Sequence, residues 1–154
     1  MTGKKISLYL DTSVIGGYYD DIFMQDTRLL FEKIKNGEYT AFISGSVVTE
    51  LKNAPERVRN ILSELNCKLI EVTPECENLA DEYIKEKVVG ETSRDDCIHI
   101  ATATINNIDI LVSWNFKHIV NFQRIRGYNT INMKNGYKVL EIHSPKEMGV
   151  YDDE

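Results

Sequence analysis

The 154-residue sequence has little of what marks secreted or membrane-embedded proteins. Its three cysteines, Cys67, Cys76 and Cys97, are odd in number and form no CxxC pair, which argues against a disulfide framework or a zinc cluster. The N-terminal apolar stretch is interrupted at Asp11, whereas a signal peptide needs ~7–15 apolar residues and a membrane span ~20. We therefore expect a cytoplasmic protein with no membrane segment.

The sequence also lacks linkers and an excess of positive charge. It has nine glycines and three prolines, and no Gly/Ser/Pro-rich stretch divides it. Lysine and arginine number 18 against 24 aspartates and glutamates, so the net charge of −6 excludes a wholly basic nucleic-acid coat. What remains is an ordinary globular composition, 42% hydrophobic and 27% charged. We predict one domain over residues 1–148, followed by a short acidic tail at 149–154.

Short β-rich runs alternate with segments of helical periodicity. The predicted strands are residues 6–10, 40–43, 68–72, 110–113 and 138–142. Helical spacing occurs in residues 27–35, after Pro55, after Pro74 and after Ser93. This alternation predicts an α/β domain with a mostly parallel sheet of about five strands flanked by helices. Ligands of such sheets gather beyond the carboxyl ends of the strands.

Three acidic residues stand near such strand ends, and each also has a simpler explanation. Asp11 follows the first strand, where an aspartate that caps a helix explains it about as well. Glu50 follows the second strand, where a solvated helical glutamate is the alternative. Asp95 and Asp96 follow Ser93, and the first turn of a helix favours carboxylates without any further role.

The combination is more specific than its parts. Ser113 and Asn115 add oxygen donors after the fourth strand, so polar groups follow three strands of one sheet. Clustered carboxylates repel one another unless a cation compensates them, and Mg²⁺ and Mn²⁺ prefer oxygen donors. We therefore expect Asp11, Glu50 and Asp96 to converge on one divalent cation.

The sequence resembles PIN-domain nucleases, and within them the VapC-like toxins of type II toxin–antitoxin systems. The resemblance rests on four stretches in order, LYLDTSVIGG, the glutamate of SVVTELKNA, DDCIHIATATINNIDILVSWNFKHI and YKVLEIHSPKEM. It implies a Rossmann-like sheet, an acidic pocket that binds Mg²⁺ or Mn²⁺, and hydrolysis of RNA phosphodiester bonds. Carried over to this sequence, the catalytic acids and metal ligands are Asp11, Glu50 and Asp96.

The fourth acidic position of the family pattern is occupied by Asn115, with Ser113 at the preceding hydroxyl position. One fewer negative charge weighs against a second metal ion. Supporting roles fall to Thr12, Ser13, Asp95 and Ser113. The resemblance also implies a small antitoxin partner, and a homodimer is compatible with the apolar helices. The alternative is a PIN fold without catalysis that binds RNA or protein, which the asparagine favours.

The positive charges are unevenly placed. Residues 110–140 contain no aspartate or glutamate and carry a charge of +5, so the rest of the chain carries −11. We predict RNA contacts from Lys117, Arg124 and Arg126 in this segment and from Arg94 beside Asp95. Trp114 is either a base-stacking residue or part of the core, and the core is favoured. We interpret His99 as structural and His118 as a capping or surface residue.

Overall fold

The computed structural model describes residues 4–149, so most of the predicted tail lies outside the described residues. All strand pairs in the sheet are parallel, in the order β3-β2-β1-β4-β5. The strands are β1 (Ile6–Leu10), β2 (Tyr39–Ser44), β3 (Lys68–Ile70), β4 (Ile110–Val112) and β5 (Glu141–His143). The predicted five-stranded α/β fold is thereby confirmed.

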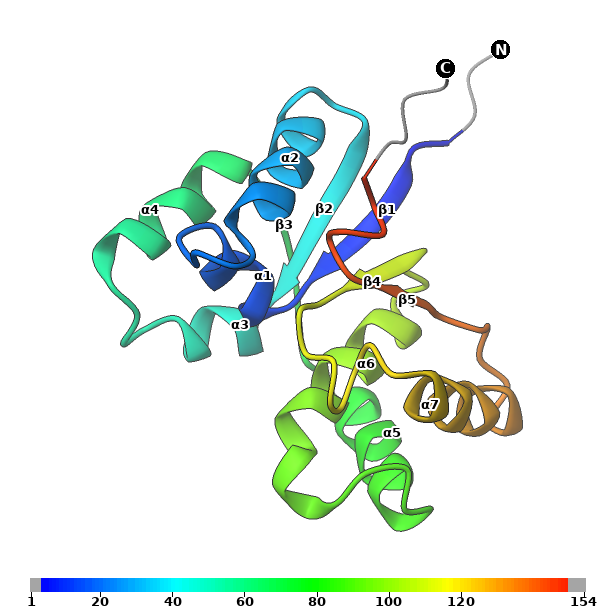
Figure 1. Ribbon diagram of the computed structural model, residues 1–154. Helices are drawn as coiled ribbons and strands as arrows, with labels where there is room; N and C mark the ends of the chain where they lie inside the picture. Colours follow the sequence, from blue (N-terminus) through cyan, green and yellow to red (C-terminus); the bar gives the residue numbers. More distant parts are fainter. Residues whose placement is uncertain (1–3, 150–154) are drawn as a thin grey trace.

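Helices cover both faces of this sheet (Figure 1). One group is α1 (Thr12–Gly17), α2 (Met24–Lys35) and α4 (Glu56–Leu65), which contact one another. The other group is α5 (Pro74–Lys85), α6 (Arg94–Ile105), which the 3-10 helix η1 (Glu91–Ser93) precedes, and α7 (Phe122–Lys134). The short helix α3 (Gly45–Glu50) continues directly from β2 and touches α6.

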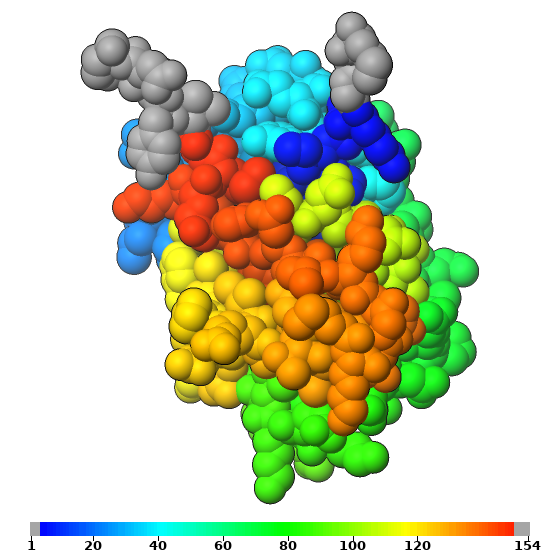
Figure 2. All heavy atoms as spheres, turned by 90° about the vertical axis from the view of Figure 1, so that its right-hand side faces the viewer, coloured from blue at the N-terminus to red at the C-terminus, as the bar shows by residue number. Residues whose placement is uncertain are grey.

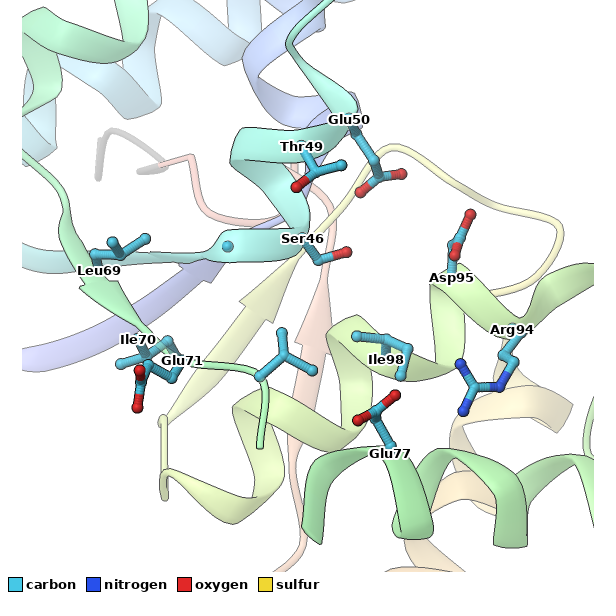
Figure 3. A pocket seen from close by; sticks show the side chains of 12 residues that line it. Ser46, Thr49, Glu50, Leu69, Ile70, Glu71, Glu77, Arg94, Asp95 and Ile98 are labelled. Atoms are coloured by element: carbon cyan, nitrogen blue, oxygen red, sulfur yellow. The ribbon is translucent and has the colours of Figure 1, made fainter. Parts of the chain in front are cut away.

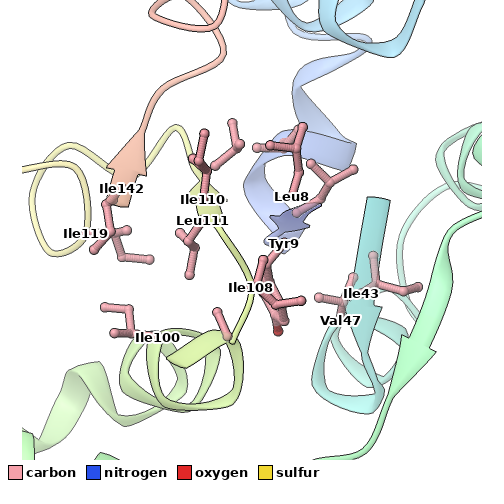
Figure 4. Close-up of a cluster of buried hydrophobic side chains, with 14 of the residues drawn as sticks. Leu8, Tyr9, Ile43, Val47, Ile100, Ile108, Ile110, Leu111, Ile119 and Ile142 are labelled. Carbon is pink, nitrogen blue, oxygen red and sulfur yellow. The ribbon is translucent and has the colours of Figure 1, made fainter. Parts of the chain in front are cut away.

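The core lies between the sheet and these helices. Leu8, Tyr9 and Leu10 of β1 are fully buried, as expected for a central strand with helices on both faces. Figure 4 shows Ile100 of α6 beside Leu111 and Ile119, so the core reaches the helix that carries Asp96. Within residues 4–149 the three cysteines form no disulfide, as predicted.

The C-terminal part of the chain closes one side of the molecule. Figure 2 shows α7 and the segment after it gathered on one face, above the helix α5. Buried Asn129 of α7 holds this arrangement, because its side chain donates to the Leu140 carbonyl at 3.0 Å and accepts from the Leu140 amide at 2.8 Å. Among the described residues, no helix combines the length and the apolar character that a membrane crossing requires.

Candidate active site

Asp11 stands at the carboxyl end of β1 and caps helix α1. Its Oδ1 accepts hydrogen bonds from the Ser13 hydroxyl at 2.7 Å and from the Val14 amide at 3.3 Å, and its Oδ2 accepts from the Ser113 hydroxyl at 2.6 Å. The residue is only 3% exposed. Burial raises the pKa of Asp11, although the charge of His99 and the bonds from Ser113 and Ser13 oppose that rise.

Glu50 is the last residue of α3 and contacts Thr12, the residue that follows Asp11. Its Oε1 accepts from the Thr12 hydroxyl at 2.8 Å and pairs with His99 Nε2 at 2.7 Å. Burial alone raises the pKa of Glu50, but the hydrogen bond and charge of His99, with Thr12 adding to them, lower it overall. Glu50 is therefore a stable carboxylate at neutral pH.

Asp96 lies in the first turn of α6, and its Oδ2 is 3.4 Å from Nδ1 of His118. Burial raises the pKa of Asp96; the charges of His118 and His99 lower it, and those of Asp11 and Glu50 raise it. The charges of Asp11 and Glu50 thus reach Asp96, although the three predicted acids come from separate elements. The sheet brings their strand and helix ends to the same edge.

His99 contacts Glu50 directly, which the sequence-based interpretation did not foresee. It is buried in α6, one turn beyond Asp96, as a structural histidine would be. However, Nε2 faces Glu50 and Nδ1 is 2.6 Å from the Tyr9 hydroxyl. Burial lowers the pKa of His99, but the Glu50 bond and the charges of Asp11, Glu50 and Asp96 raise it overall. The spacing of His99 from Asp96 was the available signal.

Asn115, at the position of the family's fourth acid, is engaged in a turn. Its Oδ1 accepts from the backbone amides of Lys117 at 3.2 Å and His118 at 2.9 Å. The backbone amide of Asn115 donates to the Ser113 hydroxyl at 2.9 Å. Ser113 in turn donates to Asp11. Asn115 therefore shapes the loop that carries His118 and steadies Ser113.

Trp114 belongs to the core, as favoured from the sequence. It is 7% exposed, its Nε1 donates to Thr27 Oγ1 at 2.8 Å, and its ring stacks on Phe23 at a centroid distance of 4.2 Å. Its backbone amide donates to the Ser13 hydroxyl at 2.9 Å. Ser13 and Ser113 thus tie the β4–α7 loop to Asp11.

Fifteen chains of solved structures match this chain, among them the following two. A chain of the VapBC2 complex from Rickettsia felis, bound to a DNA fragment from its promoter, aligns with a TM-score of 0.55 and 18% identity over 89% of this chain and 98% of that chain. VapC20 of Mycobacterium tuberculosis, a sarcin–ricin-loop-cleaving toxin, aligns with a TM-score of 0.55 and 16% identity over 71% of this chain and 91% of that chain. The chain has a PIN-like fold. No family model and no curated protein matches the sequence.

A cavity of about 600 Å³ lies beside Glu50, and neither Asp11 nor Asp96 lines it (Figure 3). Glu50 and Asp95 line one part of it, and Ile98 and Leu69 give it an apolar part. Glu71 and Glu77 also line it, so its carboxylates outnumber its one cationic side chain, Arg94. The cavity therefore favours a ligand with positive or hydrogen-bond-donating groups.

The side chains that were predicted to contact RNA differ in the contacts that they make within the protein. Arg94 Nη2 pairs with Asp81 Oδ1 at 3.1 Å, and Nη1 of Arg124 donates to the Val88 carbonyl. Arg126 lies over the exposed Phe122 ring, with its guanidinium carbon 5.7 Å from the centroid. Lys117 is exposed, one residue before His118.

The expected convergence of three carboxylates on one ion is not preformed in this PIN-like fold. Across residues 4–149, no three His, Cys, Asp or Glu side chains are arranged to hold one metal ion. Instead, His99 and His118 stand beside Glu50 and Asp96. The donors are still carboxylate and hydroxyl oxygens, which Mg²⁺ prefers, and this ion needs only one or two carboxylates when water and substrate phosphate complete its shell. The donor set fits such an ion.

Proposed function

We propose that this chain is a metal-dependent endoribonuclease that acts as the toxin of a toxin–antitoxin pair. One observation carries the proposal: on a PIN-like fold, Asp11 and Glu50 follow the paired strands β1 and β2, and Asp96 lies near enough for their charges to raise its pKa. Thr12, the residue after Asp11, donates to Glu50, and His99, which pairs with Glu50, lies one helical turn after Asp96. A toxin that cleaves cellular RNA acts in the cytoplasm, so that location belongs to the same proposal.

Asp11 and Asp96 are the proposed primary ligands of Mg²⁺ or Mn²⁺, directly or through water, and Glu50 binds the ion or orients the attacking water. Such an ion, when bound, polarises a phosphate oxygen and acidifies its water. Ser13 and Ser113 hold the Asp11 carboxylate, and Thr12 holds Glu50. Asp95, at the cavity, is a further candidate ligand. Asn115 contributes by shaping its loop.

RNA phosphates are proposed to approach from the β4–α7 side. Lys117 is exposed in the β4–α7 loop, next to His118, which contacts Asp96, and Arg126 lies on the surface of α7. Arg124 and Arg94 have partners within the protein, so their contact with RNA requires those bonds to be shared or exchanged. We expect Lys117 to contribute most among the four.

The partner proposal follows from the charge of the cavity. A VapBC2 chain, which shares this fold, was solved as part of a toxin–antitoxin complex on DNA. The cavity beside Glu50 and Asp95 is rich in carboxylates and has an apolar part, which suits a basic and apolar segment of a small antitoxin. Homodimerisation stays a proposal carried by the family resemblance alone.

A binding module without catalysis is the second candidate. It is favoured by Asn115, whose side-chain oxygen is occupied by backbone amides, and by the histidines that already stand beside Glu50 and Asp96. In this case the acidic edge would bind RNA or protein without cleaving it.

Cleavage assays with substituted acids distinguish the two candidates. The substrates are a transfer RNA mixture and a sarcin–ricin-loop hairpin, the RNA named for VapC20. We expect cleavage with Mg²⁺ or Mn²⁺ and none with EDTA. Asp11→Asn and Asp96→Asn should lower the rate by about two to three orders of magnitude, since each removes charge that holds the ion.

The matched control is Glu32→Gln, which removes an exposed carboxylate from α2. It should cleave RNA like the unsubstituted chain. RNA binding of equal strength in all these proteins, with no cleavage by any, would establish the binding module instead. Cleavage unaffected by both aspartate substitutions would show that the catalytic centre lies elsewhere.

A further inference from the structure

His99 is the centre of a hydrogen-bonded chain that ends on Glu50. The Ser44 hydroxyl is 2.7 Å from the Tyr9 hydroxyl, which is 2.6 Å from His99 Nδ1. His99 Nε2 is 2.7 Å from Glu50 Oε1. Tyr9 and Ser44 are fully buried and His99 is 2% exposed, so water does not compete for the bonds among these three residues. The Glu50 side chain is 33% exposed. Both ring nitrogens therefore have fixed partners.

The chemistry of these groups orders the chain. The Glu50 carboxylate only accepts hydrogen bonds, so Nε2 of His99 must carry the proton that it donates. Nδ1 accepts from the Tyr9 hydroxyl when the ring is neutral and donates to it when the ring is charged, so the contact to Glu50 is the same in either state. Flipping the ring would break both bonds. The imidazole is thus held in one orientation.

Glu50 needs this support because of where it lies. It is the last residue of a six-residue helix, α3, in which only Val47 is buried. So short a helix is not stable by itself, and a free glutamate side chain has several rotamers to lose. Ser44 caps α3 by accepting from the Ser46 amide at 3.2 Å. The same hydroxyl contacts Tyr9, so the start of α3 is linked through Tyr9 and His99 to Glu50 at its end.

The two bonds to Glu50 also select one of its oxygens. Thr12 and His99 both bind Oε1, at 2.8 Å and 2.7 Å, and the other oxygen, Oε2, receives neither. We propose that His99 is a positioning residue, which, with Tyr9 behind it, holds Glu50 so that Oε2 is directed to the reaction. This inference rests on the proposed function for what Glu50 does, but the arrangement itself is independent of any bound ion.

Nuclear magnetic resonance of the ¹⁵N-labelled full chain, without added metal, tests the arrangement directly. The chain has three histidines, so His118→Gln and His143→Gln assign the ring signals. We expect His99 Nε2 to be protonated. Glu50→Gln should shift the Nε2 signal, and Tyr9→Phe should shift mainly Nδ1. An unprotonated Nε2, or ring signals that ignore both substitutions, would overturn the proposal.

Kinetics with folded variants test the consequence. His99→Leu, which cannot donate, should lower kcat by about 10- to 100-fold with little change in KM, the usual effect of losing a residue that orients a ligand. His99→Gln keeps an N–H donor and should recover part of that loss, and Tyr9→Phe should lose less. The control is His143→Gln, because His143 also contacts a glutamate, Glu141 at 3.1 Å, but at the outer edge of the sheet.

The outcomes separate this inference from the proposed function. If the resonance signals behave as expected but no variant cleaves RNA, the nuclease proposal fails and the positioning arrangement stands. If the chain cleaves RNA and both His99→Leu and Tyr9→Phe retain full kcat, His99 has no positioning role. Thermal unfolding of each variant confirms that it is folded at the assay temperature.

Discussion

Asp11 caps α1 and is also a proposed metal ligand, two roles that the sequence presents as alternatives. Its Oδ1 accepts from the Val14 amide and so caps α1, and the same oxygen accepts from Ser13. A buried carboxylate is costly unless hydrogen bonds and nearby positive charge compensate it. Two hydroxyls, one amide and the charge of His99 do so here. Capping fixes the carboxylate in place, and a fixed carboxylate is what a cation site requires.

Asp96 should weaken the metal-free protein at neutral pH. Burial, together with the charges of Asp11 and Glu50, holds its pKa above the ordinary value of 3.8. Between pH 3.8 and the raised pKa of Asp96, the folded state binds more protons than the unfolded state. The free energy of unfolding therefore falls as the pH rises. Asp96→Asn should raise the Tm at pH 7 by about 2–4 °C, the shift that about 1 kcal/mol produces in a domain of this size.

The gain should shrink as the pH falls toward 4, because the carboxyl group of the unsubstituted chain is then neutral too. Thermal unfolding in EDTA at several pH values measures it. Asp95→Asn is the matched control, since Asp95 occupies the same helical turn but is exposed. Equal effects of both substitutions would mean that the helix end, and not the acidic cluster, sets the stability.

At the scale of elements, the sequence predicts the sheet well and the polar contacts poorly. The first strand is found at the predicted residues, and β4 differs from its predicted range by one residue. The last strand, predicted at 138–142, begins only at Glu141. The residues before Glu141 run along α7, where the Leu140 amide donates to Asn129. Strands are marked by local apolar patterns. Pairing of His99 with Glu50, 49 residues apart, has no local pattern.

In the candidate site, too, local patterns predict where the acidic residues lie but not their polar contacts. The places of Asp11, Glu50 and Asp96 could be predicted because Asp11 follows β1, Glu50 ends the short helix after β2 and Asp96 lies in the first turn of α6. Their role as one site stays a prediction. The turn around Asn115 was not, because its side-chain oxygen is claimed by two amides downstream. The histidines beside Glu50 and Asp96 likewise depend on how α6 and the β4–α7 loop pack.

Helix α1 depends on close contact with Trp114, and two adjacent glycines test this. A Cβ atom at Gly17 would lie 2.8 Å from Trp114 Nε1 and 2.9 Å from Thr27 Oγ1, whereas one at Gly16 meets nothing within 4 Å. Gly17→Ala should therefore destabilise the protein by about 1–3 kcal/mol through overpacking. Gly16→Ala, in the same helix, should be neutral or stabilise by up to about 1 kcal/mol.

Urea unfolding of the two variants measures the difference. Gly17→Ala should also lower any RNA cleavage, because Asp11 is the N-cap of α1 and a shift of the helix moves that cap. Similar stabilities of both variants would show that Trp114 can move aside without cost.

At the scale of the whole molecule, charge is separated along the chain. The +5 segment at 110–140 includes β4, the loop with Asn115 and α7, while the remaining residues carry −11. The acids lie where these two parts meet, since Ser113 of the basic segment donates to Asp11. Under the proposed function, the basic segment attracts RNA phosphates on one side of the acids while the negative charge of the rest of the chain limits non-specific binding.

Divalent cations should stabilise the whole folded chain, but weakly. No three-acid cluster is preformed in residues 4–149, and the raised pKa values of Asp11 and Asp96, caused first by burial, show that their charge is under-compensated. A Kd of about 1 mM would give about 1.4 kcal/mol at 10 mM Mg²⁺, or a Tm rise of about 3–6 °C. The comparison uses NaCl of equal ionic strength. The double variant Asp11→Asn/Asp96→Asn should lose this rise, and an equal rise in both proteins would mean that the ion binds away from the acids.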